Sequence, residues 1–197
     1  NITQDGDWIG VSSTDWNDAG NWCGSIPTGI TDATILAGVT NYPIVTGSYN
    51  VRDINITPGA SITTTALGIL TWSGTYINVG TLNNNGKIIL NGISPQNFPG
   101  SSATVTAMNN LEVNNPGGVN IDQSFSLTGT LTPTAGIIDL TNKTITLHSD
   151  IANTANVAAV SGGFAYSGGG KFVVERFIPA RRAWRLMTAP LTSTNTF

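Results

Sequence analysis

The feature that most constrains the fold is a run of short, β-prone segments between Val51 and Leu147. Each segment has three or four residues, and Gly, Asn, Thr or Pro separates it from the next. Their centres mostly lie six to eight residues apart, which is too close for ordinary hairpins but suits a chain wound in coils of three strands. We therefore predict an all-β fold, a β-solenoid. The segments include 54–56, 61–63, 69–72, 76–79 and 87–90, then, after a break, 103–105, 111–113, 119–121, 125–127, 137–139 and 144–147.

Composition narrows the classes of protein further. Only 10% of the residues are charged, against about 25% in an average soluble protein, yet 40% are hydrophobic, so the chain can bury a core. A net charge of −3 argues against nucleic acid as a partner. No stretch approaches about 18 apolar residues, so we expect no membrane insertion. Cys23 is the single cysteine, which excludes an internal disulfide and a thiolate metal cluster.

Three regions follow one another along the chain. Residues 1–50 are expected to form an N-terminal cap and the first strands, because a solenoid must cover its terminal coil and this region is rich in Trp. Residues 51–170 form the solenoid body. Residues 171–197, which start a following unit, are read as a hairpin-like pair of strands.

Stacked positions in the body should recur about every 18–22 residues, with Ile, Leu and Val facing inward and Thr, Asn and Ser facing outward. Thr104, Ser126 and Thr146 fit this interval, and Ile56 is expected to stack on Ile77. The break at residues 91–102 contains two prolines and is predicted to be a loop that leaves the coil.

Two groups of residues are candidates for binding. Exposed aromatic rings could stack on sugars, although burial in a core is the commoner role of such rings. The candidate rings are Trp8, Trp16, Trp22, Trp72 and Tyr76. An acidic start and a basic end could meet neighbouring domains or identical subunits, although solvated chain ends are the simpler interpretation. The candidate charges are Asp5 and Asp7 with Arg176, Arg181, Arg182 and Arg185.

The sequence contains few residues in a pattern typical of catalysis or metal binding. Asp122, Asp139 and Lys143 could converge as the carboxylates and base of a polysaccharide lyase or glycosidase, but solvated corner charges explain them more simply. His148 is the lone histidine, so no multi-histidine site exists. Asp5, Asp7, Asp15 and Asp18 could bind Ca²⁺, but their spacing matches neither an EF-hand loop nor a glycine–aspartate nonapeptide, and we predict no metal site. Thr-x-Thr pairs recur too irregularly in the sequence to indicate an ice-binding array.

The sequence also resembles a known group. Residues 86–150 resemble the Gly/Asn/Thr-rich repeat regions of large secreted cell-surface proteins of Bacteroidota. The segment KFVVERFIPARRAWRLMTAPL, residues 171–191, resembles a segment that follows such repeats, and DWNDAGNW with IPTGITDATI resembles their Trp-rich beginning. The resemblance implies export by type IX secretion, a right-handed β-helix-like body and an extracellular or cell-surface location. Because no C-terminal sorting domain is present, we expect a fragment of a longer protein.

These observations favour a non-catalytic structural or adhesive module that self-associates end to end. Its expected partners are other domains of the same long chain or identical subunits, with polysaccharide as a further possibility. The alternative is a carbohydrate-binding module of a secreted polysaccharide-acting protein. An enzyme ranks third, and no cofactor is expected apart from the Ca²⁺ alternative.

Overall fold

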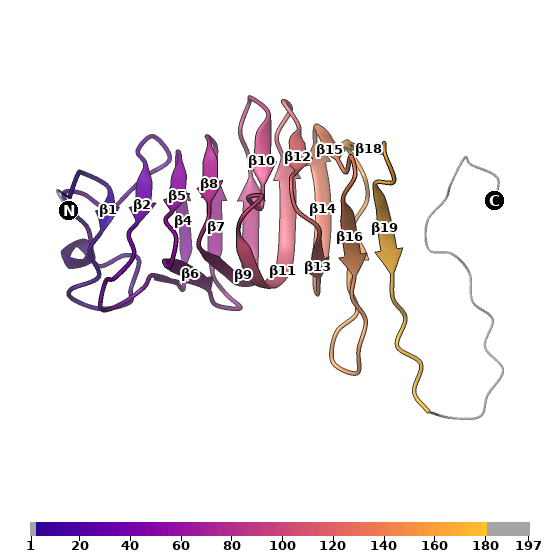
Figure 1. The fold of residues 1–197 in the computed structure, drawn as a ribbon, viewed down its shortest axis with the longest axis horizontal. Helices are drawn as coiled ribbons and strands as arrows, with labels where there is room; N and C mark the ends of the chain where they lie inside the picture. Colours follow the sequence, from indigo (N-terminus) through magenta and orange to yellow (C-terminus); the bar gives the residue numbers. More distant parts are fainter. Residues whose placement is uncertain (1–2, 181–197) are drawn as a thin grey trace.

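The computed structural model describes residues 3–180, and over this range the chain is a β-solenoid (Figure 1). The strands follow one another in a row, with β1 at one end and β19 at the other. Every ladder between named strands is parallel, and a single 3₁₀ turn, Ala19–Asn21, is the helical structure of the described residues. None of the helical structure in residues 3–180 has the length and hydrophobicity of a membrane-spanning helix. The all-β solenoid predicted from the sequence is thus confirmed.

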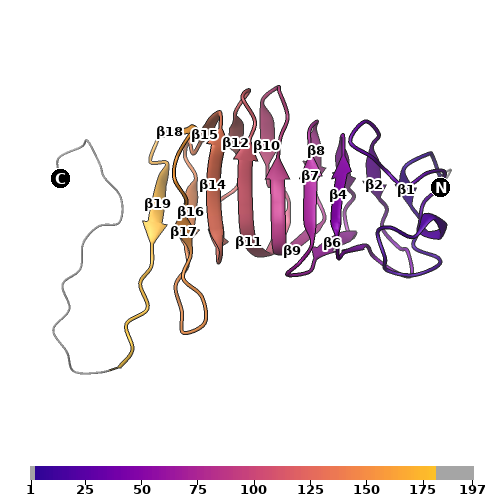
Figure 2. The ribbon, with the colours of Figure 1, turned by 180° about the vertical axis from the view of Figure 1, so that it is seen from behind.

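The strands form three faces. The first consists of two four-stranded sheets: β1 (Asp7–Trp8), β2 (Ala33–Ile35), β5 (Ile54–Ile56) and β8 (Tyr76–Asn78), then β10 (Gln96–Phe98), β12 (Val119–Ile121), β15 (Ile137–Asp139) and β18 (Gly163–Ala165). The second consists of β3 (Ile44–Val45), β6 (Ser61–Thr64), the first halves of β9 (Thr81–Leu90) and β11 (Thr104–Asn114), β13 (Phe125–Leu127), β16 (Thr144–Leu147) and β19 (Lys171–Val174). The third consists of β4 (Ser48–Val51), β7 (Ile69–Trp72), the second halves of β9 and β11, β14 (Thr130–Ala135) and β17 (Asn156–Val157). Figure 2 shows β4 and β7 of this third face side by side.

Inward-facing apolar side chains stack into one continuous core. Residues such as Ile62, Leu82, Leu111 and Ile145 are at most 1% exposed. Buried amides turn the chain at the corners: Asn78 lies where the first face meets the second, and Asn84 lies where the second meets the third. A buried amide must find hydrogen-bond partners, and the neighbouring coils provide them.

The register between coils is less regular than the sequence suggests. Ser126 pairs with Thr146 as predicted, but Thr104 pairs with Thr81 and β11 forms no ladder with β13, so the predicted stacking of Thr104 on Ser126 is wrong. Ile56 pairs with Asn78 instead of Ile77, so that predicted pairing is wrong by one residue. A slip of one residue exchanges the two sides of a strand, so Asn78 points inward while Ile77 is 53% exposed.

Two other segments differ from expectation or extend beyond the described range. Residues 91–102 do not leave the coil, because β10 lies within them and pairs with β12. The loop prediction is therefore wrong: it missed a strand whose inward positions include the polar Gln96.

At the far end of the described residues, β19 pairs in parallel with β16 and continues the solenoid. The second strand of the predicted hairpin-like segment falls on residues 181–197, outside the described residues.

Candidate functional site

The outer surface of the second face carries an uncharged array of small polar side chains. Ser61 pairs with Thr81, which pairs with Thr104, and this places three hydroxyl-bearing residues in one column across three coils. Parallel strands lie about 4.8 Å apart and alternate residues about 6.7 Å apart, so such columns form a two-dimensional grid. A second column contains Ser126 paired with Thr146.

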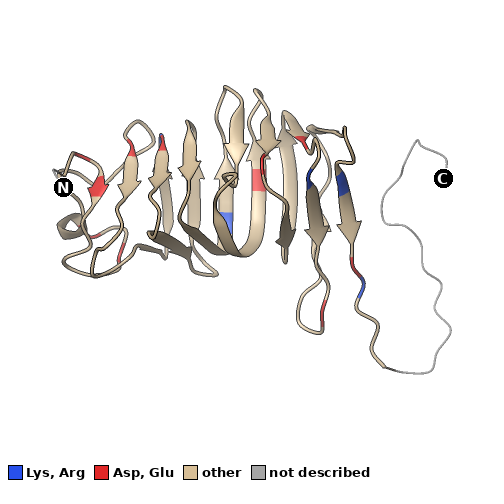
Figure 3. Ribbon diagram, viewed as in Figure 1, with Lys and Arg blue, Asp and Glu red and all other residues tan. Residues whose placement is uncertain are grey.

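Charge is absent from this array within the described strands. From β6 to β16, the strand segments of the second face contain no Asp, Glu, Lys or Arg. Lys87 and Glu112 form an ion pair on the third face, whereas Lys143 directly precedes β16 and Lys171 begins β19, the last described strand of the second face (Figure 3). We call this array, the outward side chains of the second face from β6 to β16, the hydroxyl face. It presents hydrogen-bond donors and acceptors but no charge.

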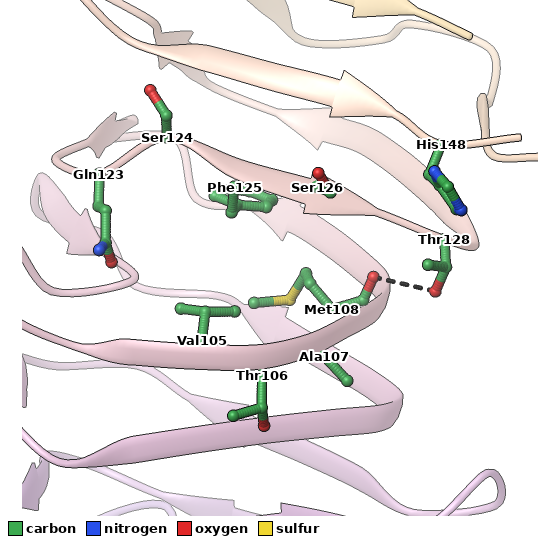
Figure 4. A pocket seen from close by; sticks show the side chains of 10 residues that line it. All are labelled: Val105, Thr106, Ala107, Met108, Gln123, Ser124, Phe125, Ser126, Thr128 and His148. Carbon is green, nitrogen blue, oxygen red and sulfur yellow. Dashed lines mark hydrogen bonds between the residues drawn. The ribbon is translucent and has the colours of Figure 1, made fainter.

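A groove interrupts the hydroxyl face between β11 and β13. The first half of β11 pairs with β9, and β13 pairs with β16, but β11 and β13 form no ladder with each other. Hydrogen bonds hold the strands together at both ends of this gap. Thr128 N donates to Met108 O at 2.9 Å, and the Gln123 side-chain amide donates to Ala103 O at 3.1 Å. The groove between them has a volume of about 440 Å³ (Figure 4).

The groove combines apolar and polar groups. Val105 supplies partly exposed apolar surface, beneath which lie the buried Met108 and Phe125, and Thr106, Ser124 and Ser126 supply hydroxyls; His148 lies at one end. The remaining lining residues are Ala107, Gln123 and Thr128. In Figure 4, Ser124 and Ser126 point to the same side of β13.

His148 is engaged on both ring nitrogens. Its Nδ1 lies 2.5 Å from Glu175 Oε2, and its Nε2 lies 3.3 Å from Asp150 Oδ2. Glu175 Oε2 also accepts a hydrogen bond from Ser149 N. The hydrogen bond to Glu175, aided by Asp150, raises the pKa of His148 above its ordinary value of 6.5. The ring therefore ties β16 to the segment after β19 and is not a free base for the groove hydroxyls.

No family model matches this chain, and no curated protein or solved structure does so either. What the chain does must therefore be inferred from its own residues.

The five candidate stacking rings all lie inside the protein. Trp8, Trp16 and Trp72 are fully buried, Trp22 is 3% exposed and Tyr76 is 5% exposed. The three cap tryptophans pack on one another, and Trp72 stacks on Tyr76. Stacking on a sugar needs an exposed ring face, which none of these rings offers. Carbohydrate binding by this structure would have to use other residues.

The candidate charges for self-association are only partly described. Asp7 is buried and accepts a hydrogen bond from Gln4 N, whereas Asp5 is exposed and accepts one from Ser25 N. Arg176 is exposed and donates to the Glu175 backbone carbonyl. Arg181, Arg182 and Arg185 lie outside the described residues.

The candidate catalytic carboxylates are bound to their own neighbours. Asp122 accepts a hydrogen bond from Gly100 N, and burial raises the pKa of its carboxyl. Asp139 accepts hydrogen bonds from the hydroxyl and the N–H of Thr141, and these lower its pKa. Among residues 3–180, no three His, Cys, Asp or Glu side chains converge in a way that could hold a metal ion.

The sequence interpretation missed the groove and Gln123. Thr104, Thr106, Ser124 and Ser126 were visible as outward polar positions. The ladder that fails to form between β11 and β13 leaves no local pattern in the sequence.

The arrangement around His148 predicts a pH-dependent anchor for the last described coil. Because the pKa is raised in the folded chain, the stabilisation is complete below about pH 6.5 and is lost as the pH rises through the folded-state pKa. A single histidine gives a single imidazole signal, so NMR titration of an untagged chain measures this pKa directly.

We expect the measured pKa of His148 to lie above 6.5, and we expect Glu175→Gln to bring it back toward that value. Lys87→Gln is the matched control, because it breaks the Lys87–Glu112 ion pair on the third face and should leave the His148 titration unchanged. A wild-type pKa at or below 6.5 would show that the ion pair does not form in solution.

Proposed function

We propose that this chain is a non-catalytic structural or adhesive module of an extracellular or cell-surface protein. The observation that carries the proposal is the uncharged hydroxyl face, which runs from β6 to β16 on a solenoid with a continuous core. Parallel ladders fix the backbone under this face in the β6–β9–β11 and β13–β16 strands. A surface fixed in this way is suited to lasting contact with an extended partner. The resemblance to Bacteroidota surface proteins supports the extracellular location and the type IX route.

Partners of two kinds fit this proposal. Other domains of the same long chain, or identical subunits, would meet the solenoid at its ends, where Asp5 and Arg176 are exposed. Polysaccharide would meet the hydroxyl face along its side. The groove between β11 and β13 is the specific observation that favours carbohydrate binding as the second candidate function.

The experiment that tests the proposal measures adsorption and cleavage together. The purified chain is incubated with a panel of insoluble and soluble polysaccharides, and both the protein that remains bound and the new reducing ends or unsaturated products are quantified. We expect adsorption without product. Cleavage that is abolished by Asp122→Asn or Asp139→Asn would make the chain an enzyme and overturn the proposal.

A further inference from the structure

The groove between β11 and β13 cannot take an inserted peptide strand. An additional strand between two others needs them about 9.6 Å apart, twice the ordinary spacing. Here Thr128 N bonds directly to Met108 O, and Gln123 bridges to Ala103 O, so both ends of the groove are held closed. The space therefore suits a compact ligand that lies in the face, and its volume of about 440 Å³ falls within the range of ligand sites, about 300–1,000 Å³.

One lining group lacks a partner. The side-chain carbonyl oxygen of Gln123 is buried and accepts no hydrogen bond, while the amide nitrogen of the same side chain is used by Ala103 O. A buried acceptor without a donor is destabilising, so it calls for an explanation. Because this oxygen is enclosed, a small shift of the Gln123 side chain toward the groove is what would let a ligand hydroxyl supply the missing donor.

The remaining lining residues define the chemistry of that ligand. Of the ten, only His148 is titratable in the ordinary range, and Glu175 and Asp150 occupy its ring nitrogens. The lining residues thus offer no free charge to an ionic ligand, and the two charges that flank them, Asp122 and Lys143, attract each other. The partly exposed Val105 and Ala107 give apolar surface beside the hydroxyls of Thr106 and Ser126. A molecule with an apolar C–H face and a rim of hydroxyls complements both.

We propose that this groove binds a neutral carbohydrate, with Gln123 Oε1 accepting from a sugar hydroxyl and Ser126 and Thr106 completing the hydrogen bonds. The inference rests on the proposed adhesive function and names its ligand class. It places recognition in the middle of the hydroxyl face and away from the buried aromatic rings.

Affinity electrophoresis tests the assignment. The full chain is run through native gels containing uncharged polysaccharides, namely laminarin, hydroxyethylcellulose or dextran, and through gels containing the anionic alginate. We expect retardation by at least one neutral glucan and none by alginate. Ser126→Arg should block the groove and weaken this binding about tenfold or more, because it removes a hydrogen bond and fills the site.

Two further variants make the test specific. Ser48→Arg adds the same side chain at an exposed position of β4 on the third face, and we expect unchanged retardation. Gln123→Met keeps the length of the side chain but removes its carbonyl together with the N–H that bonds Ala103 O, and we expect about tenfold weaker binding. Circular dichroism of each variant checks that the solenoid is intact.

The outcomes separate the site from the wider function. Equal binding by wild type and Ser126→Arg, or equal loss in Ser48→Arg, would overturn the groove as the binding site while leaving an adhesive module. Failure of the wild type to bind any neutral glucan would overturn the inference, and retardation by alginate alone would do the same. Cleavage of a glucan would instead overturn the proposed function.

Discussion

Replacing Trp72 with alanine is expected to lower the free energy of unfolding by about 3–5 kcal/mol. Its ring is fully buried, lies 4.7 Å from the Tyr76 ring at an interplanar angle of 20°, and lies 5.9 Å from the Phe98 ring. Truncation leaves a cavity that three neighbouring strands cannot fill. Because domains of this size are stable by only about 5–15 kcal/mol, the loss is a large part of the total.

The position of Trp72 makes the effect global. In a solenoid each coil contacts only its neighbours, so damage at an end can remain local. Trp72 ends β7, and its neighbours Tyr76 and Phe98 belong to β8 and β10, so the cavity spans the middle of the stack. We therefore expect the whole unfolding transition to move to lower denaturant concentration.

Urea unfolding followed by far-ultraviolet circular dichroism measures the change. Leu67→Ala is the matched control, because Leu67 is 84% exposed and its truncation should cost less than about 0.5 kcal/mol. Trp72→Phe should cost less than Trp72→Ala, since it keeps an aromatic ring and removes a buried indole N–H that has no partner. If Trp72→Ala shifted the midpoint no more than Leu67→Ala, the ring would not be buried in solution.

The coil architecture could be predicted because it depends on local patterns. Short alternating segments such as residues 61–63 and 144–146 bury every second side chain, and turn-forming residues separate them. The register could not be predicted, because coil length varies: Ile69 pairs with Lys87, 18 residues later, whereas Ile145 pairs with Phe172, 27 residues later. Loops outside the strands absorb the difference.

The candidate site was predictable only in part. A tryptophan serves equally well as a core residue or as a sugar platform, so the sequence could not decide which role Trp16 or Trp72 has. The structure places both at 0% exposure. The groove results from a ladder that fails to form between β11 and β13, although both strands look ordinary in the sequence. Its binding chemistry emerges only when Gln123 and Ser126 are brought opposite Val105 and Met108.

The second large effect on the free energy of unfolding is expected at Asn84, at the corner between the second and third faces. Asn84 is fully buried; its Oδ1 accepts from Thr64 Oγ1 at 2.6 Å and from Gly86 N at 3.1 Å, and its Nδ2 donates to Asn110 O at 3.1 Å. One side chain thus joins three successive coils. Gly86 belongs to the same corner, since a Cβ there would lie 2.2 Å from the carbonyl oxygens of Gly68 and Thr65.

We expect Asn84→Ala to lower the free energy of unfolding by about 2–4 kcal/mol, because the Thr64 hydroxyl and the Asn110 carbonyl lose their partner. Gly86 N keeps its second acceptor, Thr64 Oγ1, at 3.0 Å. Asn120→Ala is the matched control: its amide also bonds to the next coil, through Asn97 Oδ1, but it is exposed and should cost less than about 0.5 kcal/mol.

A double-mutant cycle with Thr64→Val separates the lost hydrogen bonds from the lost volume of the side chain. If these hydrogen bonds cause the destabilisation, the cost of Thr64→Val with Asn84→Leu should differ from the sum of the two single changes, because the Thr64–Asn84 bond is lost only once and Gly86 N, which keeps one acceptor in each single variant, loses both in the double variant. Strict additivity would mean that the two side chains do not interact. The asparagine would then act only by filling space, and the turn between the second and third faces would depend on Gly86 and its backbone contacts.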